Sequence, residues 1–361
     1  MQVNQTPYRK IDALSASDIK LFAKDRIAFY RQKVLGEKRK DRFNDSLTLG
    51  TLIDFALSDC RGSWQEFEQN FDDKFILLSV KKGTGQLFLL ADLLYEYTLR
   101  DMDEEGNITS SFSTRFEEAF DRLQKDDKFK GKKVEWALEQ FKDSDAETYF
   151  SENLKAIDKL PVDEWMLNKC KFIVENVLMD DNVKHLFEEQ EDVENLGKYV
   201  VEWEYKGLKA KSELDNLTIR HNPKEIIITE IKSTYDSEDF ERTYLKLRYD
   251  LAAIYYYKAI QHKLIFPEDS KLKDYFITFQ FLVVDTSPQG LRPLIYKVSH
   301  IDFLNAEHGF KTKSGYYYKG LDELVDEILW CQETQNWRIS KNAYEQKSVL
   351  NLDINYETCN N

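Results

Sequence analysis

The hydrophobic period of this chain changes near residue 197, and that change constrains the fold more than any other feature of the sequence. Before it, segments such as GQLFLLADLLYEYTLRDMD, STRFEEAFDRLQ and VEWALEQFKD have the spacing of charged amphipathic helices. After it, residues 198–205, 207–219 and 225–234 alternate as strands do, with a turn at Lys206-Gly207. The alternation predicts a three-stranded antiparallel meander.

Helices and a second hairpin are expected around this meander. The segments with helical periodicity are residues 13–34, 46–59, 240–264 and 320–337. Ser15 and Asp18 have the spacing of a capping box at the start of the first helix. Residues 274–286 and 292–299 predict a hairpin around the turn SPQG. This order predicts an α/β or α+β core with a mixed sheet flanked by helices.

The same patterns divide the chain into four parts. Residues 1–61 would supply the N-terminal helices of the core, and residues 195–340 its sheet and remaining helices. Residues 62–194 are expected to form a large helical insertion between them, and residues 341–361 a polar, flexible tail. No repeat at a fixed period is present.

Composition excludes several classes of protein. The 51 basic and 65 acidic residues give a net charge of −14, which argues against a sequence-neutral coat on DNA but not against an enzyme with a local basic cleft. The four cysteines are scattered, so a zinc ribbon or an iron–sulfur cluster is not expected. With no apolar leader and no long apolar run, a soluble protein of the cytoplasm, without membrane contact, is expected.

The third strand carries an acid and a base where apolar residues are expected. Glu230 and Lys232 follow a run of three isoleucines, and alternation places both on one face of the strand. Asp215 closes the preceding strand, so its carboxylate and that of Glu230 are expected to converge. Carboxylates, with the carbonyl of Ile231, suit Mg²⁺ or Mn²⁺, and a nearby amine would assist an attacking water. This is equipment for phosphodiester hydrolysis.

The acid-x-Lys pattern alone is weak, because it recurs along the chain. Other examples begin at Asp18, Asp72, Asp126, Glu204, Asp269 and Glu345, and most are expected to be solvated surface charges. The strand context of Glu230 and Lys232 distinguishes them from these examples.

The chain resembles the PD-(D/E)XK nuclease superfamily, in its exonuclease VIII-like branch, akin to the RecB-type and phage lambda-exonuclease-type nucleases. The resemblance rests on SELD at 212–215, EIKST at 230–234 and RYDLAAIYY at 248–256, with LSASDIKLF at 14–22 and LGTLIDFAL at 49–57. The C-terminal hairpin and Trp337 also fit, so the resemblance covers about 1–60 and 195–340. It implies a restriction-endonuclease-like core and a metal-dependent deoxyribonuclease.

The resemblance also implies roles for single residues. Asp215, Glu230 and Ile231 would hold one or two Mg²⁺ or Mn²⁺ ions, and Lys232 would assist catalysis. Asp54 stands where the family has a histidine, and is a candidate third ligand. Ala252 replaces a family glutamine, which removes one usual contact to the site.

Further site neighbours are less specific. The candidates are Tyr249, Tyr256, Glu204 and Lys211, with Glu202, Glu213 and Lys209 as weaker ones. Core packing explains the tyrosines equally well, and a solvated strand face explains the charged residues. Basic residues at 26–33 with 37–42, and at 128–136, are the candidates for contacts to phosphates.

The expected substrate is double-stranded DNA, processed by an exonuclease of phage or mobile-element recombination and repair, beside a single-strand annealing recombinase. The alternatives are a catalytically decayed nuclease fold that binds DNA or serves assembly, and an endonuclease. The sequence leaves open the polarity, the strand preference, the homo-oligomeric state and the role of residues 62–194.

Overall fold

The computed structural model describes residues 8–37, 45–103, 105–156, 159–188, 190–313 and 315–350. The chain forms two compact units. The first comprises the described parts of Met1–Arg42, Leu57–Gly62 and Glu175–Asn361, and the second those of Phe43–Ala56 and Ser63–Val174.

The first unit is built on a mixed five-stranded sheet. Its strands lie in the order β3-β4-β5-β6-β7. Its strands are β3 Val193–Tyr205, β4 Leu208–Arg220, β5 Glu225–Thr234, β6 Phe276–Asp285 and β7 Leu294–Lys297. All neighbours are antiparallel except β5 and β6, which run parallel. The predicted α/β fold class, the meander and the hairpin are confirmed.

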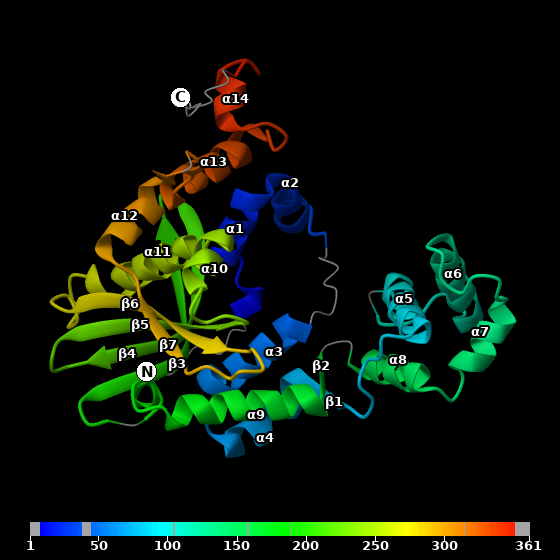
Figure 1. The fold of residues 1–361 in the computed structure, drawn as a ribbon. Coiled ribbons are helices and arrows are strands. Elements are labelled where there is room, and N and C mark those ends of the chain that lie inside the picture. The colour runs from blue at the N-terminus through cyan, green and yellow to red at the C-terminus, as the bar shows by residue number, and fades with distance from the viewer. Residues whose placement is uncertain are drawn as a thin grey trace, which may run out of the picture. The chain divides into compact units, whose positions relative to one another are not determined.

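Helices pack over one face of this sheet (Figure 1). They are α1 Ala16–Lys24, α11 Tyr249–Ile260, α12 His300–His308 and α13 Leu321–Thr334. Helix α11 lies at the centre of this layer, in contact with β3, β4 and β6 as well as with α1, α12 and α13. Its Leu251 and Tyr255 are fully buried, in one core cluster with Ile226 and Ile228 of β5. The even-numbered side chains of β5 therefore face this helical layer.

Replacing Ile228 with Ala is expected to lower the free energy of unfolding by about 2–5 kcal/mol, because it leaves a cavity in a core that cannot close fully. Ile228 has no exposed surface and pairs with Leu217 and Phe279 on the neighbouring strands. Denaturant unfolding measures the change. Ile301→Ala, at a side chain that is 68% exposed, is the matched control and should change the value by less than about 0.5 kcal/mol.

Two helices that the sequence predicts as continuous are broken in the structure. The segment predicted at 13–34 consists of α1, α2 Arg26–Phe29 and a π-helical turn Tyr30–Val34. Asp25 separates the first two with extended backbone, and its carboxylate accepts the N–H of Ala28 to cap α2.

The helix predicted at 240–264 is also divided, into α10 Phe240–Lys246, α11 and a π-helical turn Gln261–Ile265. Arg248 lies between α10 and α11 in the left-handed region, at φ 53°. Its guanidinium binds Asp250 and the carbonyl of Lys319, and these tertiary contacts offset the strained backbone.

The second unit is mainly helical, with its own core. Its helices are α3 Asp45–Asp54, α4 Trp64–Lys74, α5 Gln86–Arg100, α6 Phe112–Lys125, α7 Val134–Phe141, α8 Asp145–Lys155 and α9 Glu164–Met179, the last belonging to this unit up to Val174. A π-helical turn Phe55–Asp59 follows α3. The section predicted as a large helical insertion also contains two short strands, β1 Phe75–Leu78 and β2 Leu160–Asp163, which pair in parallel. Each of these strands has four residues, too few for a periodic signal.

Short elements complete the chain: 3₁₀ turns Tyr8–Lys10 and Lys184–Leu186, strands β8 Phe310–Lys311 and β9 Tyr317–Tyr318, and helix α14 Lys341–Glu345. The tail predicted to be flexible from residue 341 therefore begins with a helix, whose Tyr344 contacts Trp330. Residues 351–361 lie outside the described part of the chain. Across the described residues, no helix has both the length and the apolar character that crossing a bilayer requires.

Candidate active site

Strands β4 and β5 separate at the point where the predicted carboxylates lie. Their ladder runs from Arg220 opposite Glu225 to Asn216 opposite Thr229 and ends there. The next residue on each side would be Asp215 and Glu230. Instead of continuing the ladder, the backbone N–H of Ile231 donates to Oδ2 of Asp215 at 2.9 Å. The separation leaves room for side chains between two strands that are otherwise tightly paired.

The structure brings the three predicted side chains together. Nζ of Lys232 lies 2.6 Å from Oε1 of Glu230 and 4.0 Å from Oδ2 of Asp215. The same amine donates to the carbonyl of Ile231 at 3.0 Å, so this carbonyl also faces the cluster. Asp215 and Glu230 are buried, 8% and 6% exposed. Burying two acids and an amine is costly unless a function uses them.

A further lysine completes the cluster, and the sequence interpretation missed it. Nζ of Lys198, on β3, lies 2.8 Å from Oδ1 of Asp215. Lys198 has φ 46°, and the ladder of β3 with β4 omits it between Gly197–Asn216 and Tyr199–Leu214. Next to it, a Cβ on Gly197 would lie 2.3 Å from the carbonyl oxygen of Ser58, so only glycine fits there. This distortion of β3 places the amine on Asp215.

The environment drives the pKa values of the two acids apart. Burial raises the pKa of Glu230 to about 7, and the charge of Asp215 adds to the shift against the opposing effect of Lys232. Burial also opposes ionisation of Asp215, but Lys198, Lys232 and the N–H of Ile231 outweigh it and hold its pKa below its usual range. Burial disfavours the charge of Lys232, yet Glu230 and Asp215 raise its pKa. The cluster thus holds a firm anion, Asp215, beside a carboxyl, Glu230, that binds its proton more tightly than an ordinary glutamate does.

One buried oxygen in the cluster has no partner. Oε2 of Glu230 accepts no hydrogen bond from any described residue. Leaving a buried acceptor unsatisfied costs about 1–3 kcal/mol. A hard divalent cation would satisfy this atom, with Asp215 and the carbonyl of Ile231 as its neighbouring oxygen donors. The donor set therefore fits Mg²⁺ or Mn²⁺, with the amine of Lys198 as a competitor at Asp215.

Replacing Lys198 with Met should therefore increase the affinity for Mn²⁺, on the order of tenfold, because Oδ1 of Asp215 loses a competing cation. Calorimetric titration of the metal-free protein measures it. Lys209→Met, at an exposed lysine of β4, is the control and should leave the affinity unchanged. An unchanged or lower affinity in the Lys198 variant would mean that the ion does not use this oxygen.

Both candidate tyrosines of α11 lie near the cluster. Nζ of Lys232 is 5.5 Å from the ring centroid of Tyr249, a cation–π contact. Tyr256 has its pKa raised well above the usual value, first by burial and then by the charges of Glu230 and Asp215. Ala252, between them on α11, is buried at 2% exposure. Leu245 belongs to α10 and not to this helix, because of the break at Arg248.

Other candidate neighbours lie elsewhere. Glu204 is exposed on β3 opposite Lys209, six residues from Lys198, which is roughly 20 Å along a strand. Lys211 is buried at 7%, and its amine donates to the carbonyls of Tyr8 and Ile11. Its role is to hold the N-terminal segment against β4, because its hydrogen-bonding capacity is used by backbone oxygens.

The two weaker acidic candidates, Glu202 and Glu213, differ in how far their side chains are exposed. Glu202 is exposed. Glu213 is half-buried, and its charge helps raise the pKa of Tyr8 and of Tyr256.

Asp54 is the last residue of α3 in the second unit. Its role as a metal ligand stays a prediction.

The predicted basic runs are partly used within the fold. Arg26 binds Glu327 at 3.0 Å, and Lys33 binds Asp18 at 2.8 Å. Residues 38–42 of the first run lie outside the described part of the chain. In the second run, Lys132 lies over the ring of Trp136, with Nζ 4.5 Å from its centroid. These contacts within the protein add no evidence that either basic run binds phosphates.

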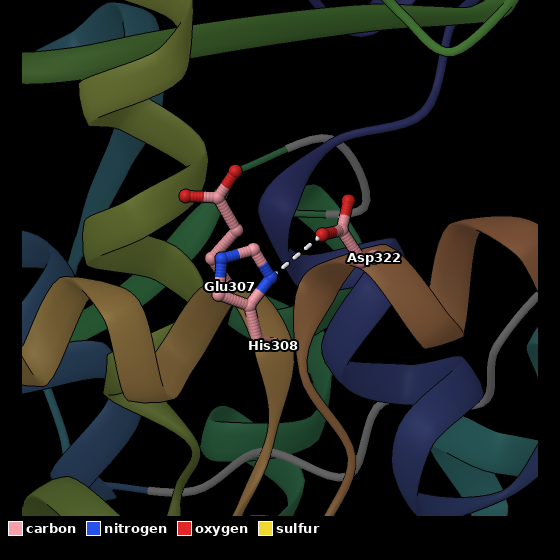
Figure 2. Close-up of side chains that lie close together, drawn as sticks. All are labelled: Glu307, His308 and Asp322. Atoms are coloured by element: carbon pink, nitrogen blue, oxygen red, sulfur yellow. Dashed lines mark hydrogen bonds and ion pairs between the residues drawn. The ribbon is translucent and has the colours of Figure 1, made fainter.

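A second acidic cluster, at the ends of α12 and α13, contains a histidine. Glu307, His308 and Asp322 offer ligand atoms within 4.8 Å of one another. Figure 2 shows Nδ1 of His308 directed at Asp322, at 3.0 Å. Glu307 binds Lys258 at 2.6 Å, and Asp322 binds Lys206 at 2.8 Å. Two lysines neutralise the two acids here and, unlike at Oε2 of Glu230, no buried side-chain atom of these three residues lacks a partner, so this network ties the β3–β4 turn to the helices and is a poor cation site.

Comparisons with known proteins do not show a family for this chain. No family model matches the sequence, and no curated protein does. Among solved structures, a "Putative exonuclease" from Eubacterium rectale is similar over 98% of this chain and 97% of the other, with a TM-score of 0.46 and 12% identity. At these values the likeness carries no argument about residues or activity, so the site is interpreted from its own geometry.

Proposed function

We propose that this protein is a Mg²⁺- or Mn²⁺-dependent nuclease that hydrolyses phosphodiester bonds of DNA. The observation that carries the proposal is the convergence of Asp215, Glu230 and Lys232 where β4 and β5 separate. The buried Oε2 of Glu230, which accepts no hydrogen bond from the described residues and which a cation would satisfy, supports the proposal. The strand motifs that resemble the PD-(D/E)XK nucleases, with a restriction-endonuclease-like core, support the same reaction.

In the proposed reaction the side chains divide the work. Asp215 and Glu230 would hold one or two divalent ions, which would supply Lewis acidity and make a nearby water more acidic. Lys232 lies next to both acids and stabilises the negative charge that develops on the phosphate. The water oxygen forms a bond to phosphorus and releases one proton to solvent. The bond to the leaving oxygen breaks, and that oxygen keeps the electron pair and takes a proton from solvent.

The biological setting follows from the resemblance alone. We infer an exonuclease that acts on double-stranded DNA in the cytoplasm, in phage or mobile-element recombination and repair, beside a single-strand annealing recombinase. An endonuclease with the same chemistry is the alternative within the enzyme class.

One observation favours a second, non-enzymatic candidate. Both oxygens of Asp215 are engaged, Oδ1 by Lys198 and Oδ2 by the N–H of Ile231. A site whose acids are neutralised by lysines could persist as a structural feature in a DNA-binding or assembly protein. Ala252, in place of the family glutamine, agrees with this candidate.

Incubation with labelled linear duplex DNA and with closed circular DNA, in Mg²⁺, in Mn²⁺ and with a chelator, separates these functions. The exonuclease predicts metal-dependent release of nucleotides from linear DNA alone. Cleavage of the circle indicates the endonuclease. No metal-dependent cleavage of either substrate, over a range of salt concentrations, contradicts the proposed reaction and favours the non-enzymatic candidate.

A further inference from the structure

A second ammonium group lies beside the cluster, on a different element. Lys20 of α1 is half-buried, with Nζ 5.0 Å from the ring centroid of Tyr249. The amine of Lys232 contacts the same ring, at 5.5 Å. One tyrosine ring of α11 thus joins a lysine of the sheet to a lysine of the first helix. Most of the other acid-x-Lys pairs are expected to be solvated surface charges, but this pair is not, since Asp18 is 6% exposed and Lys20 is half-buried.

Lys20 has no anion of its own. Among the residues that the structure describes, it makes no hydrogen bond and no ion pair. The two carboxylates whose charge acts on Lys20 are already used: Glu230 by Lys232 at 2.6 Å, and Asp250 by Arg248 at 3.0 Å. Burial and, second, the charge of Lys232 lower the pKa of Lys20. Glu230 and Asp250 oppose them, and the resulting pKa is about 8. The position is therefore unfavourable for a cation.

Two other lysines of this region, Lys33 and Lys211, have partners within the protein and stabilise the fold. Lys33 pairs with Asp18 at 2.8 Å, and Lys211 donates to two backbone carbonyls. Each has hydrogen-bond acceptors that satisfy it. Lys20 has only an aromatic ring, which is worth about 0.5–2 kcal/mol to a cation. A half-buried cation without an anion, beside a cluster built to handle phosphate, is placed to receive an anion from outside the protein.

We propose that Lys20 contacts a non-bridging oxygen of the scissile phosphate, next to Lys232, and so forms part of the catalytic site. The inference rests on the proposed function and deepens it. Negative charge on these oxygens increases as the attacking oxygen bonds to phosphorus, and a fixed ammonium stabilises that increase. Lys20 transfers no proton in this role. A bound phosphate would also supply a counter-ion to Lys20, which pairs with no carboxylate among the described residues.

The test compares Lys20→Met and Lys20→Arg with the control Lys24→Met, an exposed lysine of the same helix. With linear duplex DNA and Mn²⁺, Lys20→Met should lower kcat/KM by about 10²-fold, the size expected for one lost donor to a developing anion. Lys20→Arg should recover part of the loss, and the control should match the wild type. The melting temperature of Lys20→Met should be unchanged or higher, because an unpaired cation leaves a half-buried position.

A structural role for Lys20 predicts the opposite pattern. The melting temperature would fall, and activity per folded molecule would be unchanged. That result, or wild-type kcat/KM in Lys20→Met, overturns the inference while leaving the proposed function intact.

Failure of the proposed function is recognised separately, as absence of metal-dependent cleavage by the wild type. Binding of the same duplex in Ca²⁺ then decides about Lys20. Weaker binding by Lys20→Met than by Lys24→Met supports a phosphate contact. Equal binding by the two variants, or no binding by the wild type, contradicts it.

Discussion

Replacing Asp215 with Asn is expected to abolish metal-dependent hydrolysis of DNA, lowering the rate by roughly 10³-fold or more, because the ion loses its one firmly charged ligand. The amide is nearly the same shape, and its oxygen can still accept the N–H of Ile231, so the strands should stay in place. Affinity for Mn²⁺ should fall together with the rate. Calorimetry and nuclease assays on one preparation measure both effects.

The control for this variant is Glu204→Gln, an exposed carboxylate on β3 of the same sheet. It should retain the full rate and the full affinity for Mn²⁺. Circular dichroism and the melting temperature establish that Asp215→Asn is folded, which matters because Lys198 and Lys232 each lose an anionic neighbour. A folded Asp215→Asn variant with near-normal metal-dependent activity would remove Asp215 from the site.

Replacing Lys232 with Met is expected to lower the rate by about 10²–10⁴-fold while metal binding persists, because the amine serves the reacting water and phosphate rather than the ion. The variant frees Oε1 of Glu230, so Mn²⁺ should bind at least as tightly as in the wild type. Single-turnover assays at saturating Mn²⁺ isolate the chemical step.

Lys297→Met, at an exposed lysine of β7, is the matched control and should leave the rate unchanged. A Lys232 variant that loses metal and activity in parallel would show that the lysine organises the carboxylates instead of taking part in the reaction. A variant with full activity would exclude both roles.

The sequence predicts the strands, and the convergence of Asp215, Glu230 and Lys232, for a local reason. Strand β5 occupies the predicted range 225–234, because a β-branched run with alternation is a strong strand signal. Alternation alone places Glu230 and Lys232 on one face. The turn at Lys206-Gly207 sets the register of β3 with β4, and counting back from it pairs position 198 with position 215. That signal for Lys198 was present in the sequence and was not used.

Local sequence patterns do not predict the position of Lys20 beside Tyr249 or the breaks in the helices. The contact of Lys20 with Tyr249 joins residues more than 200 positions apart, and it depends on how α1 packs against α11. The break at Arg248 is held by the carbonyl of Lys319, another distant residue. Local periodicity carries no information about such contacts, which tertiary packing decides.

The most direct test of the account is X-ray diffraction from crystals soaked in Mn²⁺, recorded where manganese scatters anomalously. We expect an anomalous peak in contact with both Asp215 and Glu230, with Oε2 of Glu230 among the ligands of the ion. The amine of Lys198 should have moved away from Oδ1 of Asp215. A well-diffracting soaked crystal with no peak at these carboxylates, or with its peak at Glu307, His308 and Asp322 instead, would contradict it.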